Sequence, residues 1–131
     1  MAAFLDTNIV IYATIDDRRT DRALAILVDP FHISVQTLNE LTNVMRKKLK
    51  RDWIEIEDAL AAIALRSVAV HPILPSTQLH AISIAKRHNF SIYDAQVIAS
   101  ALEAGCDTLF SEDMQDGMVI ENGLTIRNPF V

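Results

Sequence analysis

The chain of 131 residues is poor in cysteine, glycine and proline, with one, three and four of them respectively. The single cysteine, Cys106, cannot form an internal disulfide or a thiolate cluster for a metal, so we expect a small buried side chain. So little glycine and proline excludes collagen-like repeats and low-complexity disorder. No repeat or linker divides the sequence. A chain of this length can bury a core as one domain, residues 1–131.

Long hydrophobic runs are also missing, although 50% of the residues are hydrophobic. The longest apolar stretch, 59–70, is interrupted by Arg66 and falls short of the roughly 18 residues that a membrane-spanning helix needs. The N-terminus carries no basic segment and has an acid at position 6, a pattern that does not fit a signal peptide. We therefore expect a cytoplasmic protein with no membrane segment.

Positive charge is in the minority, with a formal net charge of −5 and a pI near 5.2. This balance argues against a protein that binds nucleic acid by broad electrostatic attraction. The basic residues gather in two runs, 18–22 and 46–51, which we interpret as solvated helix ends. The mean hydropathy of +0.20 is high for a small protein and indicates apolar surface covered by a partner. We expect a homodimer, the commonest oligomer.

Short apolar segments alternate with longer amphipathic segments along the chain. The short segments are rich in branched residues and predict strands: 2–5, 31–35, 67–73 and 107–110. The longer segments have apolar residues at helical spacing and predict helices: 20–28, 36–49, 53–65, 76–88 and 91–104. Parallel strands joined by helices need crossovers that place helices on both faces of the sheet. The predicted fold is α/β, a three-layer α/β/α sandwich with a mainly parallel central sheet.

Local signals mark two further features. Ser91 and Asp94 form a Ser-x-x-Asp start to the last predicted helix, and Gly105 stands where a left-handed residue would end it. Near the C-terminus, Asn122 and Gly123 lie between apolar segments, the strongest short-range hairpin signal. We expect a last strand or hairpin there.

Four acidic residues follow predicted strands or lie near the start of predicted helices. Asp6 follows the first strand and Asp113 the fourth, while Glu40 and Asp94 lie in the first turns of helices. In an open parallel sheet, the carboxyl ends of the strands and the N-termini of the following helices share one edge, where ligands bind. Each acid taken singly could cap a helix or a turn. Together the four could converge on that edge.

Several carboxylates in one cleft repel one another, so at neutral pH they need cations, protons or a metal ion. The sequence has no matching set of basic residues at these strand ends, so a divalent cation is the simplest solution. All-oxygen ligands select Mg²⁺ or Mn²⁺. Such an ion can turn a bound water into a hydroxide nucleophile, and a pair can also stabilise the leaving oxygen. This is the chemistry of phosphodiester hydrolysis, and it needs no nucleophilic side chain.

Four short segments carry a resemblance to a known family. They are Phe-Leu-Asp-Thr-Asn-Ile at the N-terminus, Asn-Glu-Leu in mid-chain, Ile-Tyr-Asp-Ala in the last predicted helix, and Leu-Phe-Ser-Glu-Asp-Met-Gln-x-Gly after the fourth strand. In this order and at these spacings the chain resembles a PIN-domain ribonuclease and, more narrowly, the VapC toxins of bacterial toxin–antitoxin pairs. The resemblance spans nearly the whole chain. It implies an α/β/α sandwich, Mg²⁺- or Mn²⁺-dependent endonucleolytic cleavage of RNA, and neutralisation by a cognate antitoxin protein.

The resemblance also assigns roles to the four acids. Asp6, Glu40, Asp94 and Asp113 match the acidic quartet of the family, which implies that they are the catalytic residues. Asp6, Asp94 and Asp113 are expected to bind the metal, and Glu40 to bind it directly or through water.

Two polar residues match supporting positions of the family. We expect Asn8 to orient a carboxylate or a water, and the Ser111 hydroxyl to hold the loop that carries Asp113. Glu112 and Asp116 are close to this acid, and each is either an auxiliary acid or a solvated loop charge.

Two other functions fit parts of the pattern. A haloacid dehalogenase-type phosphatase would use Asp6 as its nucleophile and the Glu112-Asp113 pair to bind Mg²⁺. However, that family has an acid–base Asp where this chain has Asn8, and two of the four acids would then have no role. A non-catalytic binding module would use the acids only to cap helices.

Overall fold

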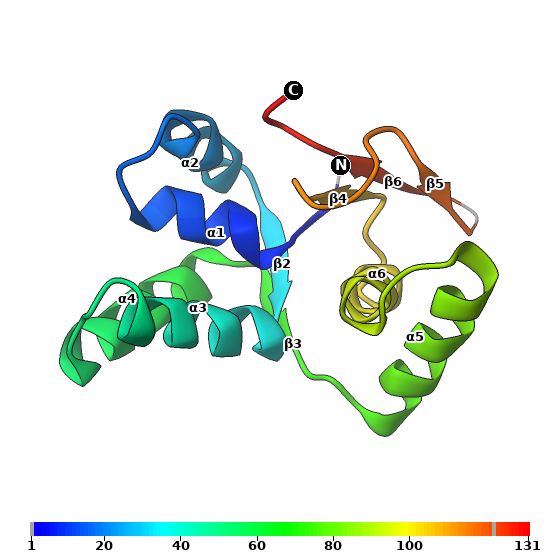
Figure 1. Ribbon diagram of the computed structural model, residues 1–131, viewed down its shortest axis with the longest axis horizontal. Helices are drawn as coiled ribbons and strands as arrows, with labels where there is room; N and C mark the ends of the chain where they lie inside the picture. The colour runs from blue at the N-terminus through cyan, green and yellow to red at the C-terminus, as the bar shows by residue number, and fades with distance from the viewer. Residues whose placement is uncertain (1, 122) are drawn as a thin grey trace.

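A computed structural model describes residues 2–121 and 123–131, and within these ranges strands and helices alternate along the chain (Figure 1). The strands are β1 (Ala3–Leu5), β2 (Phe31–Ser34), β3 (Ala69–His71), β4 (Thr108–Phe110), β5 (Val119–Ile120) and β6 (Leu124–Arg127). The helices are α1 (Thr7–Thr14), α2 (Thr20–Val28), α3 (Val35–Lys47), α4 (Trp53–Arg66), α5 (Pro75–His88) and α6 (Ile92–Glu103).

The strands form one sheet in the order β3-β2-β1-β4-β6-β5. All neighbours pair in parallel except β5 and β6, which pair antiparallel. The chain builds outward from β1 on one side, through β2 and β3, and then crosses to β4 on the other side of β1. The strand order therefore reverses between β1 and β4, and this switch point is where open α/β sheets bind ligands.

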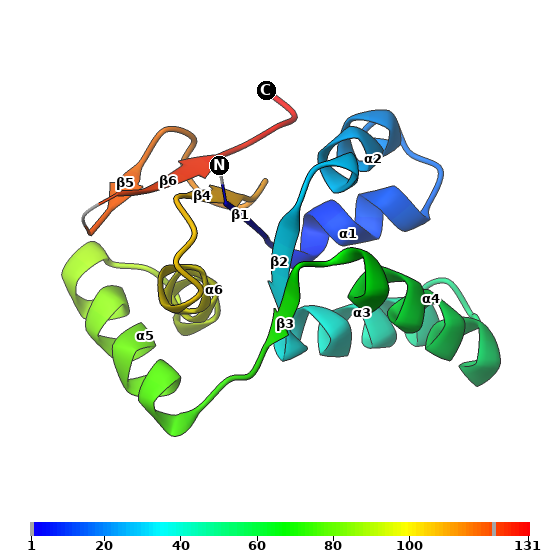
Figure 2. The same cartoon turned by 180° about the vertical axis from the view of Figure 1, so that it is seen from behind.

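Helices cover both faces of the sheet. Helices α1 to α4 lie on one side of β1, β2 and β3, and α5 and α6 lie on the other (Figures 1 and 2). Neighbouring side chains of β1 point to opposite faces: Phe4 packs in the α5–α6 cluster with Ile98, and Leu5 packs in the α1–α4 cluster with Ile33. The predicted three-layer fold with a mainly parallel sheet is confirmed.

Helix α1 is the one helix of the described ranges that the sequence analysis did not predict. Its sequence, TNIVIYAT, is rich in branched residues, which are poor helix formers and favour strands. Two contacts outweigh this preference: the Asp6 carboxylate caps the helix at Thr7, and Ile9 and Val10 are buried in the core. The other helices begin and end within two residues of their predicted bounds.

The structure contains both features that the local signals predicted. The Ser91 side chain accepts a hydrogen bond from the Asp94 N–H at the start of α6, and Gly105 follows the helix with φ +75°, as predicted. The predicted hairpin is also present, with Ile120 paired to Leu124. Asn122, part of the predicted turn, lies outside the described residues.

None of the described helices is long and apolar enough to cross a membrane.

Candidate functional site

The register of the sheet brings Asp6 and Ser111 together at the switch point. Leu5 pairs with Phe110, so the residues that follow them leave the sheet side by side. The Asp6 N–H donates to the Phe110 carbonyl at 2.9 Å, and the Ser111 hydroxyl donates to Asp6 Oδ2 at 2.8 Å. Both side chains are buried. A polar contact thus joins two residues 105 positions apart in the sequence, in the position where a ligand would bind.

Asp6 is a buried carboxylate with an altered acidity. It is 8% exposed, and its Oδ1 accepts the Thr7 N–H at 2.8 Å. Burial raises the pKa of Asp6 from 3.8 to about 6, against the hydrogen bonds from Ser111 and Thr7, and the charges of Asp113 and Glu40 raise it further. The helix-capping role considered for this residue is therefore present, but ionised Asp6 is unfavourable in the folded protein.

The other three acids approach from separate elements. Glu40 lies on α3, where its Oε1 accepts from the Gln36 amide at 2.9 Å, and Asp94 lies in the first turn of α6. Burial raises the pKa of Asp94, and so do the charges of Asp113 and Glu40. The acids therefore act on one another electrostatically. We call the region of Asp6, Glu40, Asp94 and Asp113 the acidic edge.

The acidic edge offers only carboxylate oxygens, which are the ligands that hard divalent cations prefer. All four are carboxylates, and among the described residues no Lys, Arg or His is a cause that lowers the pKa of Asp6 or Asp94. In the same ranges, no group of three His, Cys, Asp or Glu side chains is arranged to hold a metal ion. Glu40 and Asp94 are half-buried and Asp113 is exposed, so three of the four side chains have room to turn toward an ion.

Asp113 is held by the two polar residues that the sequence analysis placed beside it. The Asn8 amide donates to Asp113 Oδ2 at 3.0 Å, and the Asp113 N–H donates to the Ser111 hydroxyl oxygen at 3.2 Å. The Glu112 N–H donates to Asn8 Oδ1 at 3.4 Å. Asn8 therefore contacts two successive residues of the loop that follows β4, and Ser111 connects this loop to Asp6.

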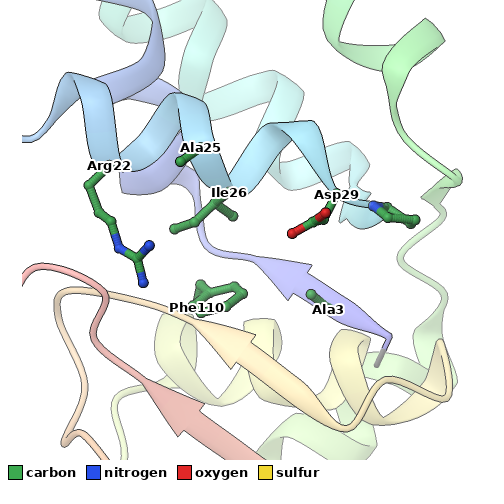
Figure 3. Close-up of a pocket in the computed structure, with 7 residues that line it drawn as sticks. Ala3, Arg22, Ala25, Ile26, Asp29 and Phe110 are labelled. Atoms are coloured by element: carbon green, nitrogen blue, oxygen red, sulfur yellow. The ribbon is translucent and has the colours of Figure 1, made fainter.

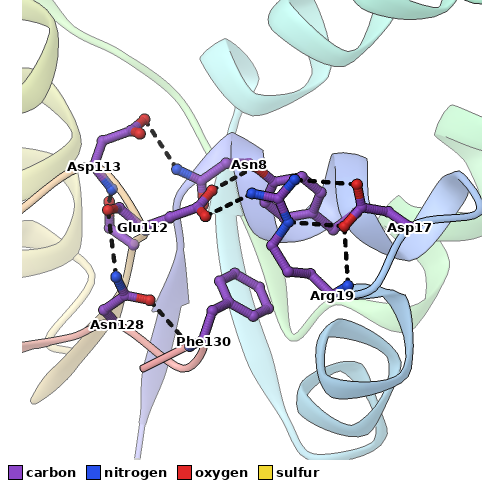
Figure 4. A network of polar contacts seen from close by, with 9 residues as sticks. Asn8, Asp17, Arg19, Glu112, Asp113, Asn128 and Phe130 are labelled. Atoms are coloured by element: carbon purple, nitrogen blue, oxygen red, sulfur yellow. Dashed lines mark hydrogen bonds and ion pairs between the residues drawn. The ribbon is translucent and has the colours of Figure 1, made fainter.

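Glu112 does not have the solvated carboxylate that one interpretation of the sequence proposed. Arg19 Nη1 donates to Glu112 Oε1 at 2.7 Å, and the Tyr12 hydroxyl donates to Glu112 Oε2 (Figure 4). Arg19 itself lies over the Tyr12 ring at 3.9 Å from its centre and pairs with Asp17 at 2.8 Å. The interpretation of the run 18–22 as a solvated helix end is thus wrong for Arg19.

The remaining acid of this loop contacts the C-terminal segment. Asp116 Oδ1 accepts from the Asn128 N–H at 2.9 Å, and Asn128 Nδ2 donates to the Glu112 carbonyl at 3.5 Å. Tyr12 and Arg19 are the residues near the acidic edge that the sequence analysis missed. Tyr12 stands four residues after Asn8 and so shares its helix face, a signal that recognising α1 would have supplied.

Two hollows of the protein bear on where a ligand could bind. A groove of about 460 Å³ opens beside Glu40 between α1 and α3, and the side chains of Ile11, Asn39 and Asn43 line it. A second cavity, of about 510 Å³, lies between α2 and the sheet, with Arg22 and Phe110 in its wall (Figure 3). None of the four acids lines this second cavity. The groove beside Glu40 is therefore the hollow that adjoins the candidate chemistry.

The fold and the acidic edge define an α/β protein with a carboxylate site at the switch point of a mainly parallel sheet. The sequence matches the PIN domain over residues 3–115. The chain belongs to the PIN domain family. The match includes all four acids of the acidic edge. A search of curated proteins found no match.

Several solved structures share the fold. A toxin–antitoxin complex from Klebsiella pneumoniae is 19% identical, with 97% of each chain covered and a TM-score of 0.74. The sarcin-ricin loop cleaving toxin VapC20 of Mycobacterium tuberculosis is 20% identical over 85% of this chain and 91% of its own, with a TM-score of 0.69. VapBC2 from Rickettsia felis, bound to a promoter DNA fragment, is 19% identical over 86% and 89%, with a TM-score of 0.63.

Proposed function

We propose that this chain is a Mg²⁺- or Mn²⁺-dependent endoribonuclease and the toxin of a toxin–antitoxin pair. Asp6, Asp94 and Asp113 would bind the metal, with Glu40 binding directly or through water. The observation that carries the proposal is the position of Asp6: a buried carboxylate at the switch point of the sheet, bonded to Ser111 and near enough to Asp113 and Glu40 for their charges to raise its pKa. A divalent cation would remove this repulsion.

The residues in and around the acidic edge would have different roles in hydrolysis. When bound, Mg²⁺ or Mn²⁺ supplies a Lewis acid that acidifies water and neutralises phosphate charge. Ser111 and the Thr7 N–H keep Asp6 fixed at the switch point, and Asn8 orients Asp113. Glu40 borders the open groove between α1 and α3 and is the acid best placed to accept a proton from water there.

The proposed substrate is RNA and the proposed partner an antitoxin. Two of the structures with this fold are described as toxin–antitoxin or VapBC assemblies, and a third as a toxin that cleaves the sarcin-ricin loop. The chain would be cytoplasmic. An antitoxin would cover part of the exposed apolar surface, which includes Leu24 and Val28 of α2, and would bring a basic side chain to the acidic edge. We also propose that the chain forms a homodimer.

The structure gives the two alternative functions less support. In a phosphatase, Asp6 would attack phosphorus, but Glu40, whose charge raises the pKa of Asp6, would then have no role. In a binding module, the acids would only stabilise helix ends, but burial and neighbouring acids disfavour the charged form of Asp6 and Asp94.

A cleavage assay tests the proposal. Purified protein free of antitoxin is incubated with a panel of structured RNAs in Mg²⁺, in Mn²⁺ and in chelator, together with the Asp94→Asn variant. We expect discrete cuts that need the metal and that the variant loses, because a ligand carboxylate has become a neutral amide. Asp29→Asn, at the opposite edge of the sheet, is the matched control and should cleave as the wild type does. Equal cleavage in chelator, or full activity of Asp94→Asn, would contradict the proposal.

A further inference from the structure

Within the loop that carries Asp113, the carboxylate of Glu112 is held more firmly than the backbone of the same residue. The two backbone contacts of Glu112, to Asn8 Oδ1 and from Asn128 Nδ2, measure 3.4 and 3.5 Å, close to the limit for a hydrogen bond. The Glu112 carboxylate, in contrast, has a charged partner at 2.7 Å and a second partner in the Tyr12 hydroxyl. Charge-assisted hydrogen bonds are roughly twice as strong as neutral ones.

The groups that hold Glu112 are themselves fixed. Arg19 is 22% exposed, and its Nε and Nη2 bind the two oxygens of Asp17 at 2.8 and 3.1 Å. Its guanidinium plane also covers the Tyr12 ring, which packs edge-on against Phe130. We call Tyr12, Arg19 and Glu112 the Glu112 clamp (Figure 4). Arg19 and Tyr12 are thus each held by a contact outside the clamp.

The clamp and the contact to Asp113 share one helix. Asn8 and Tyr12 are one turn apart on α1, so Asn8 holds Asp113 and Tyr12 holds the residue before it. The contact between Asn8 and Asp113 is exposed, and water can compete for it. Among the described residues, Asp113 lies between Met114, which is buried in the core, and the clamp at Glu112, and its own contacts are to Asn8 and to the Ser111 hydroxyl. The clamp therefore restricts the positions that the Asp113 carboxylate can take.

We infer that Glu112 and Arg19 are positioning residues that hold Asp113 toward the acidic edge and thereby set the affinity for the divalent ion. This inference rests on the proposed function. It also separates two adjacent acids that the sequence cannot distinguish: Glu112 faces Arg19, and Asp113 faces Asn8. Glu112 is not proposed as a metal ligand, because the guanidinium of Arg19 already compensates its charge.

The test measures Mn²⁺ affinity rather than activity alone. Mn²⁺ is titrated into wild type, Arg19→Ala, Glu112→Gln and the double variant, with Arg18→Ala as the matched control. Arg18 is the exposed neighbour of Arg19, so its loss removes the same charge without breaking the clamp. We expect Arg19→Ala and Glu112→Gln each to weaken Mn²⁺ binding by about 10-fold or more, as losing a partner of a ligand does. Arg18→Ala should bind as the wild type does.

Two further readouts separate positioning from a general loss of structure. The double variant should bind Mn²⁺ no more weakly than the weaker single variant, since both changes break the same contact. Amide hydrogen exchange should speed up in residues 111–113 of both single variants and remain unchanged in β1. RNA cleavage should fall at low Mn²⁺ and recover at saturating Mn²⁺. Glu112→Gln keeps the shape of the side chain and serves as the variant if Arg19→Ala does not fold.

The outcomes distinguish this inference from the proposed function. If wild type binds Mn²⁺ and both single variants bind it equally well, the positioning role is wrong and the proposed function stands. If hydrogen exchange in residues 111–113 does not change, the clamp does not hold the loop, and the inference is wrong as well. If wild type neither binds Mn²⁺ nor cleaves RNA, the proposed function fails and the positioning role fails with it.

Discussion

Replacing Asp6 with asparagine should make the protein more stable and inactive. Folding raises the pKa of Asp6 from 3.8 to about 6, a difference of about two. A change of one in pKa corresponds to about 1.4 kcal/mol, so ionised Asp6 costs the folded state about 3 kcal/mol. Asparagine is neutral and has the same shape. Its Oδ1 can accept from the Thr7 N–H, and its Nδ2 can donate to the Ser111 hydroxyl oxygen. Thr7 and Ser111 are the partners of the two Asp6 oxygens in the wild type.

The stability difference between the two proteins should depend on pH. Below the unfolded pKa of 3.8, Asp6 is protonated in both states, and the variant and the wild type should be about equally stable. As the pH rises from 3.8 through about 6, the unfolded wild type loses this proton before the folded protein does, so wild-type stability falls relative to the variant. Above that range the advantage of the variant should level at about 1 to 3 kcal/mol, or about 3 to 5 °C in Tm for each kcal/mol.

The assay is urea unfolding of both proteins with chelator present, at several pH values on either side of the pKa of Asp6. Chelator is needed because a bound cation would stabilise the wild type alone. Asp29→Asn removes an exposed aspartate before β2 and should change the stability by less than about 0.5 kcal/mol at every pH. The reasoning would be refuted if the difference in unfolding free energy between Asp6→Asn and wild type did not change with pH, or if the variant were less stable at neutral pH.

Three further predictions follow from the site and its surroundings. Millimolar Mn²⁺ should raise the Tm of wild type but not of Asp6→Asn, because only a native state with its carboxylate ligand binds the ion; equal shifts in a thermal melt would argue against a site at Asp6. Ser111→Ala should lower the unfolding free energy by about 1 to 3 kcal/mol in urea, because the buried hydroxyl joins Asp6 to the Asp113 N–H; an unchanged stability would show that this bridge is unimportant. Gly105→Ala should cost about 1 kcal/mol, since φ is +75° there and a Cβ would meet no atom within 4 Å; a larger loss would indicate a clash.

The sequence could predict the layers of the fold because periodicity and caps are local. Ser91 and Gly105 bound α6 as predicted, and the order of the segments gives a parallel sheet by rules of connection alone. Helix α1 could not be predicted from its sequence, since its branched residues favour a strand. It is a helix because Asp6 caps it and because Ile9 and Val10 fill the core beneath α2 and α3.

Part of the site could be predicted from the order of strands and helices. Asp6 and Asp113 were placed together because each follows a strand, and the ends of neighbouring parallel strands meet. The contact between Arg19 and Glu112 joins residues 93 positions apart, and it depends on the turn between α1 and α2, which has no periodic signal. Nor does the sequence indicate which of the adjacent acids Glu112 and Asp113 faces the acidic edge. The answer depends on which of the two carboxylates pairs with Arg19, and in the structure it is that of Glu112.

The chemistry of the product ends is the most direct test of the central claim, that the acidic edge uses a divalent ion to hydrolyse RNA with water. Products of metal-dependent cleavage are mapped for their terminal groups. A water acidified by an ion at Asp6, Asp94 and Asp113 would attack phosphorus in line, and the bond to the 3′ oxygen would break, so we predict 5′-phosphate and 3′-hydroxyl ends. Products with 2′,3′-cyclic phosphate and 5′-hydroxyl ends would mean that the RNA 2′-hydroxyl is the nucleophile, and would contradict the account.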